Sequence, residues 1–435
     1  MKVITGKGNE LDYKGIRKKS ESLAANIQYM PKVYALCCWS QEKIDYIYCY
    51  EAARILNIPF IPLSSSIDFK HIVTLIKNLP VSVAVYKNGK IFLVNESKRE
   101  QICDWLSLAK LCFFTSGSSG EKKLVLLTDE NIEEAVLSIQ EKLDYRCDDR
   151  VINFLPMTFD YGFYQYLLIK KTDATLYLID EGFTILSVNQ IDIHNITVLP
   201  LVPSMVTAFI SMKGRKFNGD SIKKITSTGE PISSGLINQI TTLFKKAGFY
   251  TMYGLTECKR VSILLPNETP DFKESVGRPI SCAEVVINNP DSNGIGDIIV
   301  SGKNVALGML VFSSTGKVSL RTFNGTLNTG DLGFLDSKGF LYVLGRRDSQ
   351  IKIMGQRTST IEIENAALSV DGVITCKAFT DAAGCYLQCI TNDTITELNI
   401  RHSLLKKLGN IASKIVIKII TNLDMTPNYK SKRPG

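Results

Sequence analysis

The residues best suited to chemistry form a segment rich in glycine and hydroxyl side chains, T-S-G-S-S-G-E-K-K, at positions 115–123. It separates two short apolar runs, 111–114 and 124–127, which predict two strands joined by a tight loop. Without a Cβ, Gly117 and Gly120 can adopt positive φ and let backbone N–H groups converge on an anion. The hydroxyls add donors and Lys123 adds a positive charge. The segment therefore favours a polyphosphate ligand.

This segment is not a Walker loop, which requires Gly-Lys-Ser/Thr at the start of a helix. Here Glu121 follows Gly120. The alternative is a flexible, solvated Ser/Gly turn. Three distant segments favour the first interpretation: T-M-Y-G-L-T-E at 251–257, N-T-G-D-L-G at 328–333 with Y-V-L-G-R-R-D-S-Q-I-K-I-M-G-Q-R at 342–357, and M-T-P-N-Y-K-S-K-R at 425–433.

In this order and spacing, the four segments resemble the adenylate-forming (AMP-binding) superfamily, which includes acyl-CoA synthetases, luciferases and the adenylation domains of peptide synthetases. The resemblance covers the chain from residue 111 to its end. It implies an enzyme that uses ATP and Mg²⁺ to convert a carboxylic acid into an acyl-adenylate with release of pyrophosphate, and then transfers the acyl group to a thiol. The implied ATP/AMP-binding residues are Thr115, Ser116, Gly117, Ser118, Ser119, Gly120, Lys123, Gly229, Glu230, Pro231, Tyr253, Gly254, Thr256, Asp331 and Arg346.

Residue type suggests the part that several of these side chains play. Tyr253 offers a flat face for adenine, and Thr256 can donate a hydrogen bond to a phosphoryl oxygen. Glu257 is a hard oxygen ligand for Mg²⁺, the alternative being a solvated surface carboxylate. Asp331 follows a Thr-Gly turn and can accept hydrogen bonds from both ribose hydroxyls, the alternative being a turn-forming Asp. Arg346 would reach the ribose or a phosphate, with its neighbour at 347 as the substitute if the register differs by one.

The resemblance also assigns residues of the last segment and of the hinge. Lys430 is the implied catalytic lysine, whose ammonium would contact both the attacking carboxylate and the α-phosphate. Tyr429 stands where the family usually has glycine. Asp348 corresponds to the hinge about which a small C-terminal domain rotates between the two half-reactions. Lys352 and Gly355 would lie on the face used in the thiol step.

The acid-binding side is represented by L-P-M-T-F-D-Y-G at 155–162, which contains Phe159 and Asp160. Amino-acid-activating members of the family carry an Asp after Phe here, and it pairs with the substrate ammonium. The segment therefore suggests an amino-acid ligase that loads the phosphopantetheine thiol of an acidic carrier protein. The alternatives are an acyl-CoA ligase that uses free CoA, and a non-catalytic nucleotide-binding relative. Asp160 could instead cap a helix that begins at Tyr161. Pocket volume would depend on Phe159, Tyr161, Met205 and Cys258.

Composition and periodicity indicate the cellular compartment, the fold class and the domain division. The chain has 435 residues, a net charge of +8 and eleven cysteines without a C-x-x-C pair, which favours a soluble protein of the reducing cytoplasm and gives no indication of nucleic-acid or membrane binding. Apolar runs alternate with helical patterns and predict an α/β fold of layered βα units around a mostly parallel sheet, with a β-rich part after residue 296. We expect an abridged AMP-binding domain at 1–348 and a mobile α+β domain at 349–435.

Overall fold

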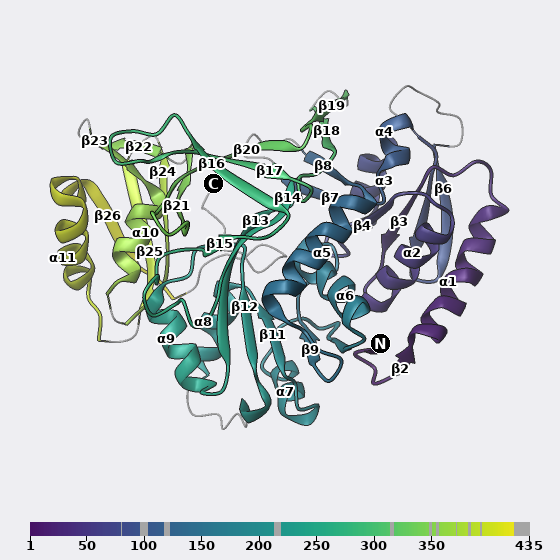
Figure 1. Cartoon of the computed structure of the whole chain (residues 1–435), viewed down its shortest axis with the longest axis horizontal. Helices are drawn as coiled ribbons and strands as arrows, with labels where there is room; N and C mark the ends of the chain where they lie inside the picture. The colour runs from purple at the N-terminus through teal and green to yellow at the C-terminus, as the bar shows by residue number, and fades with distance from the viewer. Residues whose placement is uncertain are drawn as a thin grey trace.

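The computed structural model describes residues 1–79, 81–95, 103–116, 122–212, 219–313, 317–347, 350–353, 356–370, 372–381, 384–391 and 394–421. A large N-terminal part contains two big mixed sheets and a smaller antiparallel one, and a small α+β part follows it (Figure 1). The described helices include none that is both long enough and apolar enough to cross a membrane.

The first large sheet has parallel strands at its centre and antiparallel strands at both edges. In spatial order its nine strands are β15 (Arg278–Pro279), β14 (Cys258–Leu264), β13 (Gly248–Leu255), β12 (Lys224–Ser227), β11 (Val198–Leu201), β9 (Arg150–Asn153), β10 (Thr175–Leu178), β1 (Lys2–Ile4) and β2 (Glu10–Asp12).

The second large sheet has eight strands and is parallel only through its middle. In spatial order these are β19 (Val318–Thr322), β18 (Gly308–Phe312), β8 (Lys122–Leu127), β7 (Leu111–Ser116), β4 (Phe60–Leu63), β3 (Ala35–Trp39), β5 (Val83–Lys87) and β6 (Lys90–Val94). Strands β7 and β8 form the predicted antiparallel pair on either side of the Ser/Gly segment.

Helices packed between the two large sheets form the main core. Phe163 of α6 contacts the rings of Phe60 and Phe113 in the eight-stranded sheet, while α6 itself also packs on β9 and β10 of the nine-stranded sheet. Burying aromatic rings of this size is a large part of what holds such layers together. The helices of the N-terminal part are α1 (Tyr13–Gln28), α2 (Lys43–Ile55), α3 (Phe69–Lys77), α4 (Cys103–Leu108), α5 (Asp129–Leu143), α6 (Asp160–Thr172), α7 (Gln190–Ile193), α8 (Pro203–Ser211) and α9 (Ser234–Leu243).

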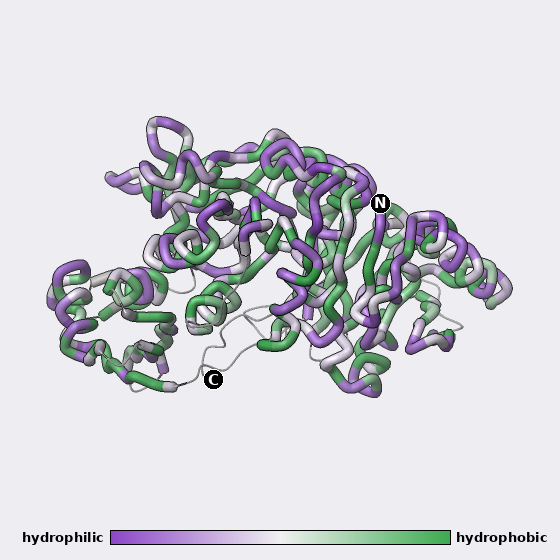
Figure 2. The backbone as a smooth tube through the Cα atoms, turned by 90° about the horizontal axis from the view of Figure 1, so that it is seen from below, coloured by the Kyte–Doolittle hydropathy of each residue, from purple (hydrophilic) through white to green (hydrophobic). Residues whose placement is uncertain are grey.

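The C-terminal half of the chain adds two smaller units. A four-stranded antiparallel sheet contains β16 (Ala283–Asn288), β17 (Gly296–Gly302), β20 (Thr326–Leu335) and β21 (Leu341–Arg346). The small α+β part has its own apolar core and comprises β22 (Gln350–Ile353), β23 (Gln356–Ser359), α10 (Thr360–Leu368), β24 (Val373–Asp381), β25 (Gly384–Thr391), α11 (Glu397–Leu408) and β26 (Ile415–Ile419). Figure 2 shows this part to one side of the N-terminal layers.

The structure confirms the predicted fold class and corrects one feature of the sheet. The sequence predicts βα units around one mostly parallel sheet, whereas the structure has two large sheets, each with antiparallel edges. Periodicity specifies the type of an element but not the sheet that it joins, which depends on contacts between distant residues. The apolar patterns in the sequence also predict a helix over residues 129–143 and strands at 151–156 and 296–302. The helix and the last strand match α5 and β17. The strand at 151–156 ends earlier, at Asn153, whose side chain accepts a hydrogen bond from the Leu155 amide. The predicted division at residue 348 lies outside the described residues.

Candidate active site

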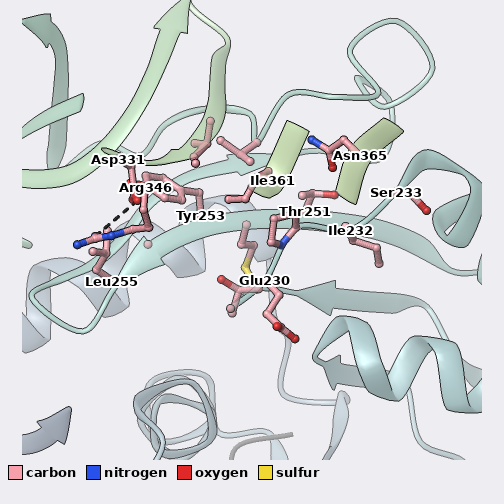
Figure 3. A pocket seen from close by; sticks show the side chains of 18 of the residues that line it. Glu230, Ile232, Ser233, Thr251, Tyr253, Leu255, Asp331, Arg346, Ile361 and Asn365 are labelled. Carbon is pink, nitrogen blue, oxygen red and sulfur yellow. Dashed lines mark hydrogen bonds and ion pairs between the residues drawn. The ribbon is translucent and has the colours of Figure 1, made fainter. Parts of the chain in front are cut away.

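A cavity of about 1550 Å³ lies where the large N-terminal part meets α10 of the small part (Figure 3). Its wall includes every predicted ATP/AMP-binding, catalytic and metal-binding residue whose side chain the structure describes, together with Phe159 and Asp160, although these residues come from six separate segments. They are Thr115, Lys123, Phe159, Asp160, Gly229, Glu230, Pro231, Tyr253, Gly254, Thr256, Glu257, Asp331 and Arg346. The loop residues Gly117, Ser118, Ser119 and Gly120, the side chain of Ser116, and Asp348, Gly355, Tyr429 and Lys430 lie outside the described residues, as does the side chain of Lys352.

Asp331 stands at the centre of a hydrogen-bonded corner of the cavity. The Tyr253 hydroxyl donates to Asp331 Oδ2 at 2.5 Å, and Arg346 Nη1 lies 3.5 Å from Asp331 Oδ1. Asp331 and Arg346 are cross-strand partners on β20 and β21, so the sheet register brings them together. Burial, together with the Asp331 carboxylate, raises the pKa of Tyr253, which keeps its hydroxyl protonated and able to donate. The corner offers a carboxylate, a ring and a guanidinium, which suits a ribose next to a phosphate.

The backbone around Asp331 holds this corner in place. Thr329 Oγ1 accepts a hydrogen bond from the Asp331 amide at 3.1 Å and donates to the carbonyl of Ile298 at 2.9 Å. Gly330 has φ of +75°, and a Cβ at this position would lie 2.9 Å from Arg346 Nη2. The turn therefore favours glycine, and a side chain at this position would displace the guanidinium.

The structure separates the two neighbouring arginines. Arg346 lines the cavity and donates from Nη1 to the Thr329 carbonyl at 2.6 Å. Arg347 instead donates from Nε to Asp297 Oδ1 at 2.6 Å and does not line the cavity. The alternative register, in which Arg347 serves the nucleotide, does not fit this arrangement.

Glu257 and Thr256 lie in the turn between β13 and β14, at the same cavity as Lys123. Burial is the main cause that raises the pKa of Glu257, and Asp160 adds to it, whereas Lys123 and Arg346 partly offset the increase. A further cation nearby would stabilise the ionised form of this carboxylate. Mg²⁺ is commonly bound by one or two carboxylates together with substrate phosphates and water. Among the described residues no cluster of three or more metal-ligating side chains occurs. The position of Glu257 in the cavity wall suits this mode of binding, in which the metal is shared with a phosphate-bearing ligand.

The turn after β12 forms a second wall of the cavity. Gly229 has φ of +99°, a conformation that favours glycine, and places Glu230 and Pro231 at the cavity. Glu230 Oε1 lies 3.6 Å from Lys377 Nζ on β24 of the small part. Figure 3 shows Glu230 on one side of the cavity, and Ile361 and Asn365 of α10 on the other. The small part thus contacts the nucleotide-binding candidates directly.

Asp160 has an internal cationic partner. It is the first residue of α6, Phe159 is the N-cap, and Asp160 Oδ1 accepts from the Tyr161 amide at 2.8 Å. Lys259 Nζ lies 2.8 Å from Asp160 Oδ2, with both side chains almost completely buried. Asp160 is therefore the first residue of the helix and not its N-cap, as the alternative interpretation predicted. Tyr161, Met205 and Cys258, predicted to set pocket volume, are buried but do not line the cavity.

The sequence analysis did not identify Lys259 and Lys377. Lys259 and Arg260 interrupt the otherwise largely apolar strand β14, in which every residue is buried. Two adjacent cations within a buried strand are a detectable pattern because burying a charge without a partner is costly. The sequence around Lys377 has no comparable pattern, because buried and less buried residues alternate along β24. The contact between Lys377 and Glu230 depends on how the small part packs against the large one.

Comparison with known proteins agrees with this geometry. The family model for AMP-binding enzymes matches residues 64–310, and the chain belongs to this family. A nonribosomal peptide synthetase of Cordyceps militaris, cm3A, is 24% identical over 416 residues, which cover 86% of this chain and 8% of that protein. A 2-succinylbenzoate–CoA ligase of Oceanobacillus iheyensis is 29% identical over 266 residues, which cover 60% of this chain and 54% of that protein.

Solved structures show the same fold over the whole chain. The o-succinylbenzoate CoA synthetase of Bacillus subtilis, in complex with an acyl-adenylate intermediate, has a TM-score of 0.79 at 19% identity and covers 99% of this chain and 93% of its own. The same enzyme has also been solved with ATP and a magnesium ion. The matched part of the present chain spans about half or less of the curated relatives described here.

Proposed function

We propose that this protein is an AMP-forming acid–thiol ligase, which activates a carboxylic acid with ATP and Mg²⁺ and passes the acyl group to a thiol. The observation that carries the proposal is the convergence of the described nucleotide-binding, metal-binding and catalytic candidates, together with Phe159 and Asp160, on one cavity. The ribose corner at Asp331, the metal candidate Glu257 and the cation Lys123 occupy this cavity together. Relatives that are named as CoA ligases and peptide synthetases support the same class of reaction.

Several described residues would each have a separate role in the first half-reaction, the formation of the acyl-adenylate. Asp331 would accept the ribose hydroxyls, and Tyr253 would pack against the base while its hydroxyl holds the Asp331 carboxylate. Glu257 would hold Mg²⁺, which would neutralise triphosphate charge. Thr256 and Lys123 would hold phosphoryl oxygens in line for attack by the substrate carboxylate. Pyrophosphate leaves as the carboxylate oxygen bonds to the α-phosphorus. We expect the ammonium group of Lys430 to complete this site.

The acid and the acceptor are less closely defined. One candidate is an amino acid that is loaded onto the phosphopantetheine of a carrier protein, supported by the F-D-Y-G segment and by the peptide-synthetase relatives. The other is an acid that is transferred to free CoA, supported by the 2-succinylbenzoate–CoA ligase relatives and by the fold of their solved counterpart. For both we propose a domain division near Asp348 and rotation of the small domain between the two steps.

The proposal is tested by incubating the purified full chain with Mg²⁺, ATP and a broad acid library, and by following AMP and pyrophosphate release. We expect AMP formation with at least one acid, and its loss in Glu257→Gln and Lys430→Ala while AMP binding persists. Mass spectrometry with CoA and with a carrier protein in separate reactions identifies the acceptor. Nucleotide binding without AMP release from any acid would instead identify a non-catalytic relative.

A further inference from the structure

A buried ion pair lies at the acid-binding end of the cavity, around Asp160. Lys259 and Asp160 form an ion pair at 2.8 Å, with 3% and 8% of their side chains exposed. Lys259 Nζ also lies 4.5 Å from the centre of the Tyr164 ring, so α6 encloses the ammonium with a carboxylate and an aromatic face. Asp160 lines the cavity and Lys259 lies behind it, outside the cavity wall.

A distortion of β14 places a second cation beside the first. Arg260 has φ of +52°, which interrupts the usual alternation of side chains along the strand. As a result the two consecutive cations both face α6, Lys259 over Tyr164 and Arg260 over Tyr161 at 5.3 Å. Arg260 is 3% exposed, its Nε has no hydrogen-bond partner, and no carboxylate of the described residues lies within 4.0 Å of its guanidinium.

This arrangement determines which acyl groups the end of the cavity can accept. An ammonium bound by Asp160 would bring a third positive charge beside Lys259 and Arg260, and it would have to share a carboxylate that already pairs with Lys259. Like charges at low local dielectric repel strongly, and a buried carboxylate that already has a cation attracts a second one weakly. An acid without an ammonium group leaves the existing pair intact.

We infer that the activated acid lacks an ammonium group beside its carboxylate, and that Lys259 is the residue that excludes amino acids by occupying Asp160. This rests on the proposed function and names its substrate class. Of the two candidate substrates described above, it favours the acid that is not an amino acid. It does not decide between free CoA and a carrier protein as the thiol.

The test compares matched, non-reactive acyl-adenylate mimics that differ only in the ammonium group. Alanyl and propanoyl sulfamoyl adenosine form one pair, and phenylalanyl and hydrocinnamoyl sulfamoyl adenosine form another. Calorimetric titration of the full chain measures each affinity without turnover. We expect the mimic without ammonium to bind at least about tenfold more tightly in each pair. Tighter or equal binding of the aminoacyl mimics would overturn the inference, and binding of none would overturn the proposed function on which it rests.

Two variants distinguish the exclusion of amino acids by Lys259 from a purely structural role of this residue. In Lys259→Met, Asp160 loses its cation, so the affinity ratio should shift toward the aminoacyl mimic. The matched control is the double variant Asp160→Asn with Lys259→Met, which removes both charges and should show no such shift. A ratio that is the same in all three proteins would contradict the inference, and the measurement on the unmodified chain decides it if a variant fails to fold.

Discussion

Lys377 of the small C-terminal part lies 3.6 Å from Glu230 in the cavity wall and 3.7 Å from Glu364 on α10. All three side chains are largely buried, and Glu364 Oε1 also accepts a hydrogen bond from the Ala378 amide at 2.9 Å. One ammonium therefore stands between two carboxylates at the contact between the two parts of the chain. A movement of the small part would have to break the Lys377–Glu230 contact.

Replacement of Lys377 by Met should destabilise the contact between the two parts. The change leaves two buried carboxylates without their shared cation, and loss of one partner of a buried pair typically costs about 3–5 kcal/mol. Urea unfolding of the full chain measures the effect. Lys418→Met is the matched control, because Lys418 is an exposed cation on β26 of the same three-stranded sheet and should change stability little. Equal effects of the two variants would show that the Lys377 contacts are unimportant.

Removal of the Tyr253 hydroxyl should weaken nucleotide binding. Tyr253→Phe keeps the ring but deletes the 2.5 Å hydrogen bond to Asp331, and a hydrogen bond to a charged group contributes roughly 1.5–3 kcal/mol, or about tenfold or more in affinity. Titration with AMP measures this loss. Tyr250→Phe makes the same change on the same strand but away from the cavity, and should leave AMP affinity unchanged. An unaltered AMP affinity in Tyr253→Phe would contradict the predicted ribose corner.

An alanine at position 330 should displace Arg346 from the cavity. Gly330→Ala adds a methyl group 2.9 Å from the guanidinium at a residue with φ of +75°. Gly339→Ala is a close control, because Gly339 has φ of +79° but the added methyl group would have nothing within 4 Å of it. Both variants should lose about 1–2 kcal/mol of stability from the left-handed backbone. Only Gly330→Ala should also weaken ATP binding, and equal ATP affinities would show that Arg346 does not contact the nucleotide.

Lys43 should make stability depend on pH. It is buried, donates from Nζ to the Asn153 carbonyl at 2.9 Å, and burial lowers its pKa to about 7. Between that value and the ordinary 10.5, the unfolded chain binds a proton that the folded chain does not, so the Lys43 contribution to stability rises with pH by up to roughly 1.4 kcal/mol per unit. Below pH 7 both states are protonated and the contribution is constant.

The measurement is urea unfolding of the unmodified chain and Lys43→Met at pH 6, 7, 8 and 9. We expect the difference in unfolding free energy between them to change between about pH 7 and 9 and to stay level between about pH 6 and 7. Lys70→Met, an exposed lysine on α3, is the control and should show a constant difference. A pH-independent difference for Lys43→Met would show that Lys43 remains charged in the folded protein.

The fold class follows from local patterns in the sequence, and most of the candidate site follows from the resemblance of four segments to the adenylate-forming superfamily. Residues such as Glu257 and Asp331 stand in segments whose side-chain types suit their chemistry whatever surrounds them, and the structure places both at one cavity. Helix α5 was equally predictable, because Thr128 and Asn131 form a local capping box at its start. Local patterns of this kind depend on residues close together in the chain.

Long-range packing, in contrast, settles which distant charges meet. The sequence predicts that Asp160 is available to a substrate ammonium, but the Asp160–Lys259 pair joins residues 99 positions apart. The same holds for Lys377 and Glu230, whose contact depends on how the small part packs against the large one. Whether a carboxylate attracts a substrate depends on its burial and on the cations around it, and these are properties of the packed fold rather than of any segment.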